Sequence, residues 1–559
     1  MFLFILNRVM ENNRNSYIIP VGVIRTDSKI SFRRRDDYIW ARDMEKKCEN
    51  QSLWSVCLSI NQRGECMKRG SGILMHISSL PGKYGIGTLG KSAYLFADFL
   101  KQSGQKYWQI LPLGHTGYGD SPYQCFSAYA GNPYFIDLDR LKDEGLLEEE
   151  DLVPLQEASS ERVDFEKLFY TKYPVLRKAY EKGKDKFKGE IEKFRSENRA
   201  WVEDYSLYMA VKEAMDNKSW IEWDEPIKQR YPEALRVYRT KLKEKIDFWV
   251  FIQYEFYKQW QELKEYVNGI GIKIIGDLPI YIAADSSDAW AYPEIFQLNE
   301  KRMPIVVAGC PPDAFTEDGQ LWGNPIYDWD YLERTGYKWW IKRMEASLKL
   351  YDVIRIDHFR GFESYWAVPY GEDTARYGKW IKGPGIKLFN ALKIALGNMD
   401  IIAEDLGFLT QEVLDFREET GYPGMKVLQF AFDSDEENAY LPHNCIKNSV
   451  IYTGTHDNST IKGWFKDIEK EVGEHARSYL KLDHEEGYNW GFIRGAWSSV
   501  SDLAVTQMQD ILGLDDTARM NKPGILGGNW KWRMKEGVLT DELAQHIYSM
   551  TKLYGRNLS

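Results

Sequence analysis

The sequence predicts an α/β fold, a parallel (β/α)8 TIM barrel with large helical and loop insertions over the C-terminal face of the barrel. Eight short apolar segments alternate with helical segments along the chain, which is typical of a parallel sheet rather than a sandwich. Four of those segments end at or near an acidic residue, as expected where an active site is built on the strand ends of a barrel. Two stretches between strands are too long to be simple loops, so they are predicted to be insertions.

The eight predicted strands are short runs rich in Ile, Val, Leu and aromatic residues, the composition of strands that are buried on both faces. Helical segments separate them, for example residues 92–104 (SAYLFADFLKQSG) and 409–421 (LTQEVLDFREETG). The second of these closes on Gly421, a residue type that commonly ends a helix. The predicted strands span residues 72–78, 107–113, 272–282, 352–359, 400–407, 426–432, 450–457 and 503–510.

The first insertion follows the second predicted strand and covers about residues 140–265. Two of its segments, 165–194 and 238–267, have the composition and apolar spacing of helices, so we expect an inserted helical subdomain. The second insertion, about residues 283–345, is rich in Pro, Gly and Trp, and we expect it to lie like a lid over the mouth of the barrel. Both insertions belong to a catalytic barrel that is predicted to span residues 67–559.

Residues 1–66 differ from the rest of the chain, because their scattered single apolar residues keep no period of 2 or 3.6. At Met67 the pattern changes to a strand followed by a Pro-Gly turn, in MKRGSGILMHISSLPGKYGIG. We therefore expect Met67 to be the native start and residues 1–66 to be an N-terminal extension that is not part of the native fold.

Charge and hydropathy disfavour nucleic-acid binding and membrane insertion. The chain has 559 residues with 73 Lys and Arg against 83 Asp and Glu, a formal net charge of -10, which disfavours nucleic acid as a partner. Its strongly basic run is Arg33 to Arg35. No apolar run approaches the ~20 residues that cross a membrane, and MFLFIL lacks the flanks of a signal segment. We expect a cytoplasmic protein without membrane or nucleic-acid partners.

The cysteines favour neither a disulfide framework nor a metal site. There are six of them, and the three nearest the N-terminus recur every nine residues, which is not the spacing of a zinc site. We expect no metal and no cofactor, and free thiols at Cys48, Cys57, Cys66, Cys125, Cys310 and Cys445.

Aromatic residues make up 14% of the chain, and many Trp and Tyr lie in polar, loop-like segments such as QLWGNPIYDWD (320–330). Flat apolar faces with polar rims suit the C–H faces of sugar rings, but aromatic side chains are also the largest contributors to protein cores. Composition alone supports a sugar-binding surface and ordinary packing equally.

Acidic residues mark the ends of four predicted strands. All strand ends of a parallel barrel point to one face, so these side chains are expected to converge there. One strand-end aspartate is well explained as a helix N-cap, but four of them, two next to Arg355 and His456, are better explained by a functional site. The four residues are Asp277, Asp357, Glu404 and Asp457.

Metal binding and glycosidic bond cleavage are the two main uses of clustered carboxylates. A metal site is disfavoured because the set lacks extra histidines or Asp-x-Asp spacing. Glycosidic cleavage needs a carboxylate nucleophile and a carboxylic acid whose pKa values are pushed apart. Arg355 is placed to keep Asp357 ionised, which leaves Glu404 protonated beside a second negative charge. A retaining mechanism requires about 5 Å between these two carboxyl groups.

Three motifs, RIDHFRG (355–361), AEDLG (403–407) and GTHDN (454–458), resemble the α-amylase superfamily. The closer resemblance is to the 4-α-glucanotransferases (amylomaltases or disproportionating enzymes, glycoside hydrolase family 77). It runs from about Met67 to the C-terminus, and Cys125 stands where that family would have serine. The resemblance is carried by HISSLPGKYGIGTLG, YWQILPLGHTGYGDSPYQCFSAYAGNPYFID, GDLPIYIAADSSDAW, GCPPDAFTEDGQLWGNPIYDW and MNKPGILGGNWKWR.

The resemblance implies transfer of α-1,4-glucan segments between maltodextrins by a retaining double displacement through a covalent glucosyl-enzyme. It implies α-1,4-glucans and maltooligosaccharides as donors, and glucose or maltooligosaccharides as acceptors. By the same resemblance Asp357 is the nucleophile, Glu404 is the general acid/base and Asp457 is the transition-state stabiliser.

The resemblance also implies a set of substrate-binding residues. His456 binds the same glucose as Asp457, Asp277 supports that ring, and Tyr123 stacks on it. Trp322 is expected on a flexible loop over the cleft, and Tyr118 matches a position that binds glucan at a second, remote site in some members. The full predicted set is Arg355, His456, Asp277, Tyr123, Trp322, Tyr118, His358, Phe430 and Asn529.

Three alternatives compete with glucan transfer. GIGTLG (85–90) fits a dinucleotide fingerprint, but the next predicted strand ends without the required acidic residue. A glucan hydrolase of the α-amylase type would use the same carboxylates with water as the acceptor. The aromatic segment 310–330 favours transfer, because it is placed to hold an acceptor sugar and exclude water. A carbohydrate-binding protein without catalysis would lack the acid or the nucleophile, and both are present.

Overall fold

In the computed structural model of this chain, the described residues begin at residue 68 and belong to one compact unit. The predicted N-terminal extension, residues 1–66, lies outside the described residues, so that expectation stays a prediction. The structure describes residues 68–117, 119–156, 161–312, 316–407, 409–525 and 527–557.

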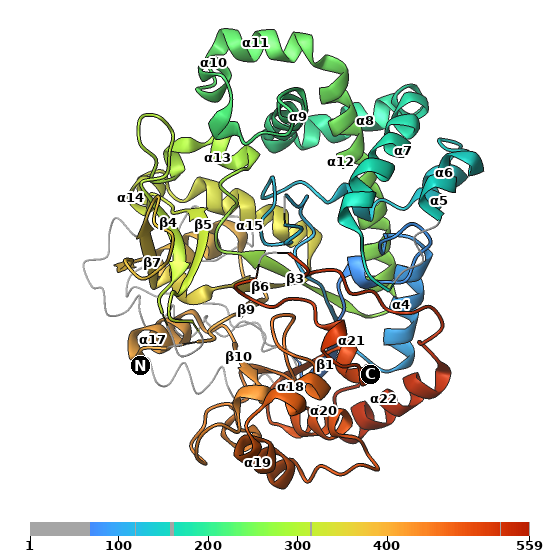
Figure 1. Ribbon diagram of the computed structural model, residues 1–559, viewed down its shortest axis with the longest axis vertical. Coiled ribbons are helices and arrows are strands. Elements are labelled where there is room, and N and C mark those ends of the chain that lie inside the picture. Colours follow the sequence, from blue (N-terminus) through green and yellow to red (C-terminus); the bar gives the residue numbers. More distant parts are fainter. Residues whose placement is uncertain are drawn as a thin grey trace, which may run out of the picture. The chain divides into compact units, whose positions relative to one another are not determined.

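Eight parallel strands form a closed barrel in this unit (Figure 1). Each strand pairs with the barrel strands before and after it in the chain, and β12 closes the ring against β1. The predicted (β/α)8 barrel is confirmed, with all eight predicted strands present. The strands are β1 (Gly70–Leu74), β2 (Tyr107–Gln109), β3 (Lys273–Pro279), β6 (Val353–Asp357), β9 (Ile401–Ala403), β10 (Gly424–Val427), β11 (Ser449–Tyr452) and β12 (Leu503–Gln507).

The strands are shorter than the sequence predicted, mainly at their C-terminal ends. β2 stops at Gln109 rather than at residue 113, and β11 stops at Tyr452 rather than at residue 457. Pro112 follows β2 and Gly454 follows β11. Proline has no N–H to give to a strand ladder and glycine weakens pairing, so both residue types favour an early end. The chain beyond these ends forms the loops of the C-terminal face.

Helices alternate with the strands around the barrel. The predicted helix at 409–421 is α17, and Gly421 caps it in the left-handed conformation with a φ of 75°, which glycine adopts without steric cost. The helices that follow barrel strands are α4 (Lys91–Gln102), α15 (Lys338–Leu350), α16 (Ile386–Leu396), α17 (Gln411–Thr420), α18 (Ile461–Asp467), α19 (Lys470–Leu480), α20 (Tyr488–Ser498), α21 (Met508–Ile511) and α22 (Asp541–Leu553).

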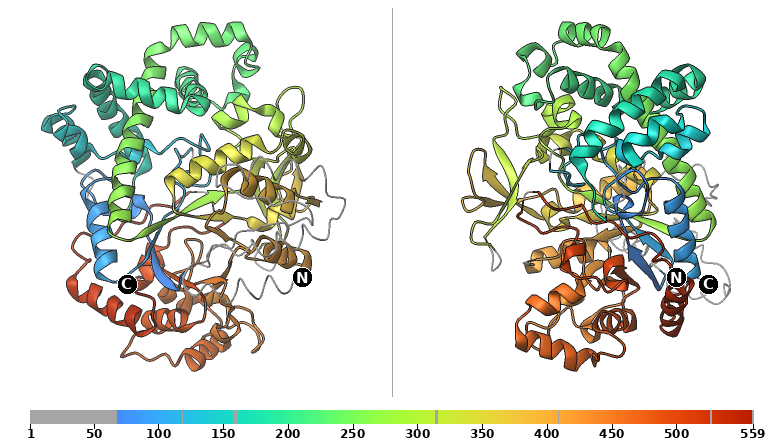
Figure 2. Two further views of the ribbon diagram at one scale, coloured as in Figure 1. Left: turned by 180° about the vertical axis from the view of Figure 1, so that it is seen from behind. Right: turned by 45° about the vertical axis from the view of Figure 1, so that its right-hand side comes forward.

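Between β2 and β3 the chain forms a group of helices, most of which lie in the upper part of Figures 1 and 2. The longest, α12, has 27 residues, packs against α7, α8 and α9, and leads back to β3. The sequence predicted helices here, and their grouping into a separate subdomain stays a prediction. They are α5 (Leu138–Asp143), α6 (Glu149–Gln156), α7 (Phe165–Lys186), α8 (Lys188–Glu197), α9 (Arg199–Ala214), α10 (Glu225–Lys228), α11 (Pro232–Lys241) and α12 (Lys243–Gly269).

A second, antiparallel sheet has the strand order β5-β4-β7-β8 (Figure 1). The expected lid segment, 283–345, contributes two of its strands together with α13 (Ser287–Ala291) and α14 (Trp329–Arg334), so regular structure replaces much of the expected loop. Its placement over the barrel mouth stays a prediction. The strands are β4 (Val306–Cys310), β5 (Gln320–Pro325), β7 (Ser364–Pro369) and β8 (Lys379–Lys382).

Much of the aromatic content packs the core that runs through the barrel and the helices around it. Tryptophan in particular fills this core, so the packing interpretation holds for these residues: Trp108, Trp220, Trp260, Trp290, Trp340 and Trp497 are all fully buried. Cys125, Cys310 and Cys445 are not in disulfides, and the other three cysteines lie outside the described residues. Within the described ranges, no helix combines the length and hydropathy needed to cross a membrane.

Gly276, in the middle of β3, has no room for a side chain. A Cβ atom at this position would lie 2.1 Å from the ring of Tyr351, which is itself only 5% exposed. Gly276→Ala should therefore lower the free energy of unfolding by about 1–3 kcal/mol, the usual effect of overpacking a core. Urea unfolding measures it.

Gly189→Ala is the matched control, because no atom lies within 4 Å of a Cβ at that helical position. Equal unfolding free energies for Gly276→Ala and Gly189→Ala would contradict the close packing of β3 against Tyr351.

Candidate active site

The four predicted acidic residues lie on one face of the barrel, on three neighbouring strands and one loop. Asp277 is within β3, Asp357 is the last residue of β6, and Glu404 directly follows β9. β6 pairs with β3 on one side and with β9 on the other. Asp457 lies on the loop beyond Tyr452, the last residue of β11, and not on a strand as the sequence predicted.

The strand register places Asp357 and Glu404 side by side. Ile356 pairs with Ala403 in the ladder between β6 and β9, and the N–H of Glu404 donates to the Ile356 carbonyl at 3.1 Å. Neighbouring strands lie about 4.8 Å apart. Asp357, which follows Ile356, and Glu404, which follows Ala403, therefore project from adjacent backbone positions. This register is compatible with the expected separation of about 5 Å between the two carboxyl groups, which stays a prediction.

Arg355 joins two of the strand-end carboxylates. Its side chain is 3% exposed, and one nitrogen, Nη1, donates to both oxygens of Asp277 at 2.8 and 2.7 Å. The same nitrogen donates to Oδ1 of Asp357 at 3.1 Å. A buried guanidinium requires such partners, because an uncompensated charge in the interior is costly. Arg355 and Asp277 also face each other in the β3–β6 register, so the pair is set by the barrel itself.

Glu404 is held by backbone donors that follow the two strands. The N–H of His358 donates to Oε2 at 2.6 Å, and the N–H of Leu406 donates to Oε1 at 3.0 Å. His358 has a φ of 50°, in the left-handed region that a residue other than glycine rarely adopts. Backbone strain of this kind clusters at functional sites. Here it turns the peptide after Asp357 toward the Glu404 carboxylate.

The pKa values of the three catalytic candidates are separated by their surroundings. Burial raises the pKa of Asp357 to about 6, and Arg355 opposes that rise. Burial raises the pKa of Glu404 further, to about 7, with Asp357 adding to it. Burial also acts on Asp457, but the charge and hydrogen bond of His456, together with a hydrogen bond from Asn521, outweigh it and lower the pKa to about 2. Arg355 lowers the pKa of Asp357, the direction that the sequence analysis expected, but burial is the larger influence.

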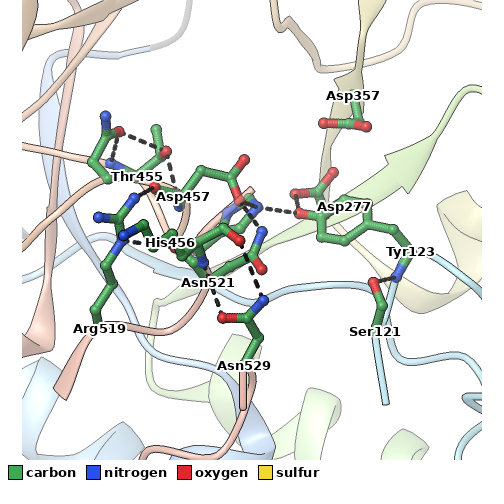
Figure 3. Close-up of polar contacts among 12 residues, drawn as sticks. Ser121, Tyr123, Asp277, Asp357, Thr455, His456, Asp457, Arg519, Asn521 and Asn529 are labelled. Carbon is green, nitrogen blue, oxygen red and sulfur yellow. Dashed lines mark hydrogen bonds and ion pairs between the residues drawn. The ribbon is translucent and has the colours of Figure 1, made fainter. Parts of the chain in front are cut away.

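A chain of polar contacts links Asp277 to Asp457 (Figure 3). The Tyr123 hydroxyl donates to Oδ2 of Asp277 at 2.8 Å and lies 2.9 Å from Nε2 of His456. That nitrogen lies 3.3 Å from Oδ1 of Asp457. The Tyr123 and His456 rings are stacked, with centroids 5.2 Å apart. Burial opposes a charge on His456, but Asp457 outweighs it and raises the pKa of the imidazole.

Other predicted binding residues lie at different distances from this centre. Trp322 is in strand β5, not on a loop as expected, because its segment pairs with β4; its ring packs edge-on against His358 with centroids 4.8 Å apart. Phe430 ends a short 3-10 helix and contacts Tyr440. Asn529 hydrogen-bonds backbone groups of its own loop rather than a catalytic candidate. Tyr118 lies outside the described residues.

Two residues that the sequence analysis did not single out contact the loop of Asp457. Asn521 donates to its carboxylate, and Arg519 donates to its backbone carbonyl. A signal was available, since both are polar residues in the segment that follows the eighth strand, and all such segments of a parallel barrel open on one face. No group of three or more His, Cys, Asp or Glu arranged to hold a metal ion occurs among the described residues.

Known proteins are similar to this chain in sequence and in fold. The Glyco_hydro_77 family model, described as 4-alpha-glucanotransferase, matches residues 75–540. The 4-alpha-glucanotransferase of Clostridium butyricum is 57% identical over 485 residues, which are 86% of this chain and 100% of that protein. The 4-alpha-glucanotransferase of Streptococcus pneumoniae TIGR4 is 51% identical over 496 residues, 88% of this chain and 98% of that protein.

A solved structure is similar to this chain in both sequence and fold. The amylomaltase from Streptococcus agalactiae, in complex with acarbose, is 44% identical and superposes with a TM-score of 0.86. The match covers 88% of this chain and 100% of that chain.

Removing the charge of Arg355 should make Asp357 harder to ionise. The guanidinium favours the carboxylate form of Asp357, so Arg355→Gln should raise the lower of the two pKa values, about 6 for Asp357, toward the value of about 7 for Glu404. Arg355→Lys keeps a positive charge and should raise it less. A ¹³C NMR titration of protein labelled at the Asp and Glu carboxyl carbons measures both values.

Arg195→Gln is the control, because Arg195 pairs with Glu203 and Asp247 in the helical insertion. An Asp357 pKa that does not rise in Arg355→Gln, or that rises equally in Arg195→Gln, would contradict this account of the electrostatics.

Proposed function

The chain belongs to the 4-alpha-glucanotransferase family, and we propose that it transfers α-1,4-glucan segments between maltodextrins by a retaining double displacement in which Asp357, Glu404 and Asp457 do the chemistry. One observation carries the assignment of residues. Asp357 and Glu404 project from adjacent positions of paired strands, and their surroundings give them unequal, raised pKa values. A nucleophile and an acid of this kind are what retaining cleavage of a glycosidic bond requires.

In the first step Asp357 attacks the anomeric carbon of the donor glucose while Glu404 protonates the departing glycosidic oxygen. The order of the pKa values supports these roles, because Asp357 loses its proton before Glu404 does. Arg355 stabilises the attacking carboxylate without blocking it, since its hydrogen bond goes to one oxygen, Oδ1. The products of this step are a shortened glucan and a glucosyl ester on Asp357.

Asp457 acts on the sugar ring rather than on the bond that breaks. Its low pKa keeps it ionised at neutral pH. A carboxylate in this position would accept hydrogen bonds from ring hydroxyls and favour the flattened, positively charged ring of the transition state over the ground state. His456 and Tyr123 support it through the chain that begins at Asp277.

In the second step an acceptor hydroxyl displaces Asp357, with Glu404 now taking the proton. We infer that Trp322 and His358 receive the acceptor, because their rings pack against each other and His358 directly follows Asp357 in the chain. Nε2 of His358 is buried and has no hydrogen-bond partner among the described residues. Burial lowers the pKa of His358 to about 3, so the imidazole is neutral.

The proposed donors are α-1,4-glucans and maltooligosaccharides, and the proposed acceptors are glucose or maltooligosaccharides. We also propose that the enzyme works in the cytoplasm, in keeping with the lack of disulfides at the described cysteines. Tyr123, Phe430 and Asn529 are retained as proposed substrate-binding residues.

Asp357→Asn and Glu404→Gln should each lower kcat by at least about a thousandfold, because each removes a group that acts in both steps. An α-glucosyl fluoride donor separates the two roles, since fluoride leaves without protonation. Glu404→Gln should therefore release fluoride from it at a rate much closer to that of the wild type, whereas Asp357→Asn should not. An Asp357→Asn enzyme that keeps substantial activity would end the assignment.

Incubation with maltotriose distinguishes transfer from hydrolysis. Transfer should give glucose together with a ladder of products longer than maltotriose, resolved by anion-exchange chromatography. Exclusively shorter sugars would contradict the proposal, because they require water as the acceptor.

A further inference from the structure

The two oxygens of the Asp457 carboxylate differ in their hydrogen bonding. Oδ1 accepts a hydrogen bond from Nδ2 of Asn521 at 2.6 Å and lies 3.3 Å from Nε2 of His456 (Figure 3). Oδ2 has no hydrogen-bond partner among the described residues. The Asp457 side chain is 40% exposed although its neighbour His456 is only 3% exposed. The side chain is therefore partly open to solvent while one of its oxygens is held by the protein.

Asn521 is itself held in place on two sides. Its backbone N–H donates to the His456 carbonyl at 3.0 Å, and its carbonyl accepts from Nε of Arg519 at 2.8 Å. Arg519 also donates to the Asp457 carbonyl and, at 2.9 Å, to Oγ of Ser459. The segment after β12 thus hydrogen-bonds three groups of the Asp457 loop besides the carboxylate. They are the His456 carbonyl, the Asp457 carbonyl and Oγ of Ser459. The Asn521 amide has little freedom to move away.

The hydrogen bond between Asn521 and Asp457 has a fixed polarity. An ionised carboxylate has only acceptors, so the amide nitrogen, not the amide oxygen, must face it. Hydrogen bonds to a charged acceptor are among the stronger ones in proteins, and one at the carboxylate favours its ionised form. The other charged groups facing this carboxylate are His456, Arg355 and Asp357. Asn521 is the neutral member of the set and adds a donor without adding charge.

We propose that Asn521 is a positioning residue for glucan transfer: it ties one oxygen of Asp457 to the protein so that the other oxygen is presented to the glucose ring. The inference rests on the role proposed above for Asp457. Binding of the distant parts of a glucan chain does not depend on this hydrogen bond, so its loss acts on the transition state more than on the ground state.

Asn521→Ala and Asn521→Asp test the proposal by their kinetics on maltotriose. Asn521→Ala should lower kcat by about 10- to 100-fold, the range for losing a hydrogen bond to a charged group, with KM changed by less than about threefold. Asn521→Asp keeps the shape but replaces the donor with a carboxylate, so at pH 7 it should lower kcat further than alanine does.

The pH profile separates positioning from packing. As the pH falls from 7 to 5, the carboxyl group introduced by Asn521→Asp takes up a proton and becomes a donor again. The ratio of wild-type to variant kcat should then shrink by at least about tenfold. A role in packing alone predicts that the isosteric Asn521→Asp is active and that the ratio is independent of pH, which would overturn the proposal. Thermal unfolding shows whether each variant is folded. If Asn521→Ala does not fold, the pH profile of Asn521→Asp by itself distinguishes positioning from packing.

Two further variants complete the test. Asn448→Ala removes an exposed amide that donates to the Gly421 carbonyl at 3.1 Å, and it should leave kcat unchanged. Asp457→Asn should abolish transfer. If Asp457→Asn keeps wild-type kcat, the proposed function of that residue fails; if it is inactive while both Asn521 variants match the wild type, only the positioning role fails.

Discussion

A single buried guanidinium inside the barrel is the constraint on which the site depends. Arg355 is 3% exposed and shares one nitrogen between the carboxylates of Asp277 and Asp357. Breaking a buried ion pair by removing one partner leaves an uncompensated charge, which is strongly destabilising. The three residues therefore hold one another, and because Asp277 and Arg355 face each other in the strand register, the position of Asp357 follows from the closure of the barrel.

A network of polar contacts extends from the partner of Arg355, Asp277, to the more exposed Asp457. Contacts pass from Asp277 through Tyr123 and His456 to Asp457, whose side chain is 40% exposed. The carboxyl groups of the site have different partners, and these partners give them different protonation states. Asp457, beside His456 and Asn521, has a pKa of about 2, whereas Glu404, held mainly by backbone N–H groups, has a pKa of about 7. A division between a permanent anion and a proton donor follows from those contacts.

The sequence predicted the barrel and its strand-end acids because both are local patterns. An apolar run that ends in an acidic residue, as before Asp357, is visible without knowledge of the fold. Features set by tertiary pairing were not predictable: Trp322 lies in a strand because β5 pairs with β4, and Asn521 reaches Asp457 across 64 residues of chain. The left-handed conformation of His358 was also not predictable from the sequence, because it depends on the hydrogen bond between the His358 N–H and Glu404.

The central claim, that Asp357 becomes the covalent carrier of the glucosyl unit, is tested most directly by trapping that intermediate. A 5-fluoro-α-glucosyl fluoride reacts through its activated leaving group, while the ring fluorine slows the second step. Proteolysis and mass spectrometry should then locate one added fluoroglucosyl group on the peptide that contains Asp357, and competition with maltotriose should reduce the labelling. A label on Glu404, on Asp457 or on another residue, or turnover of the reagent without any labelled peptide, would contradict the account.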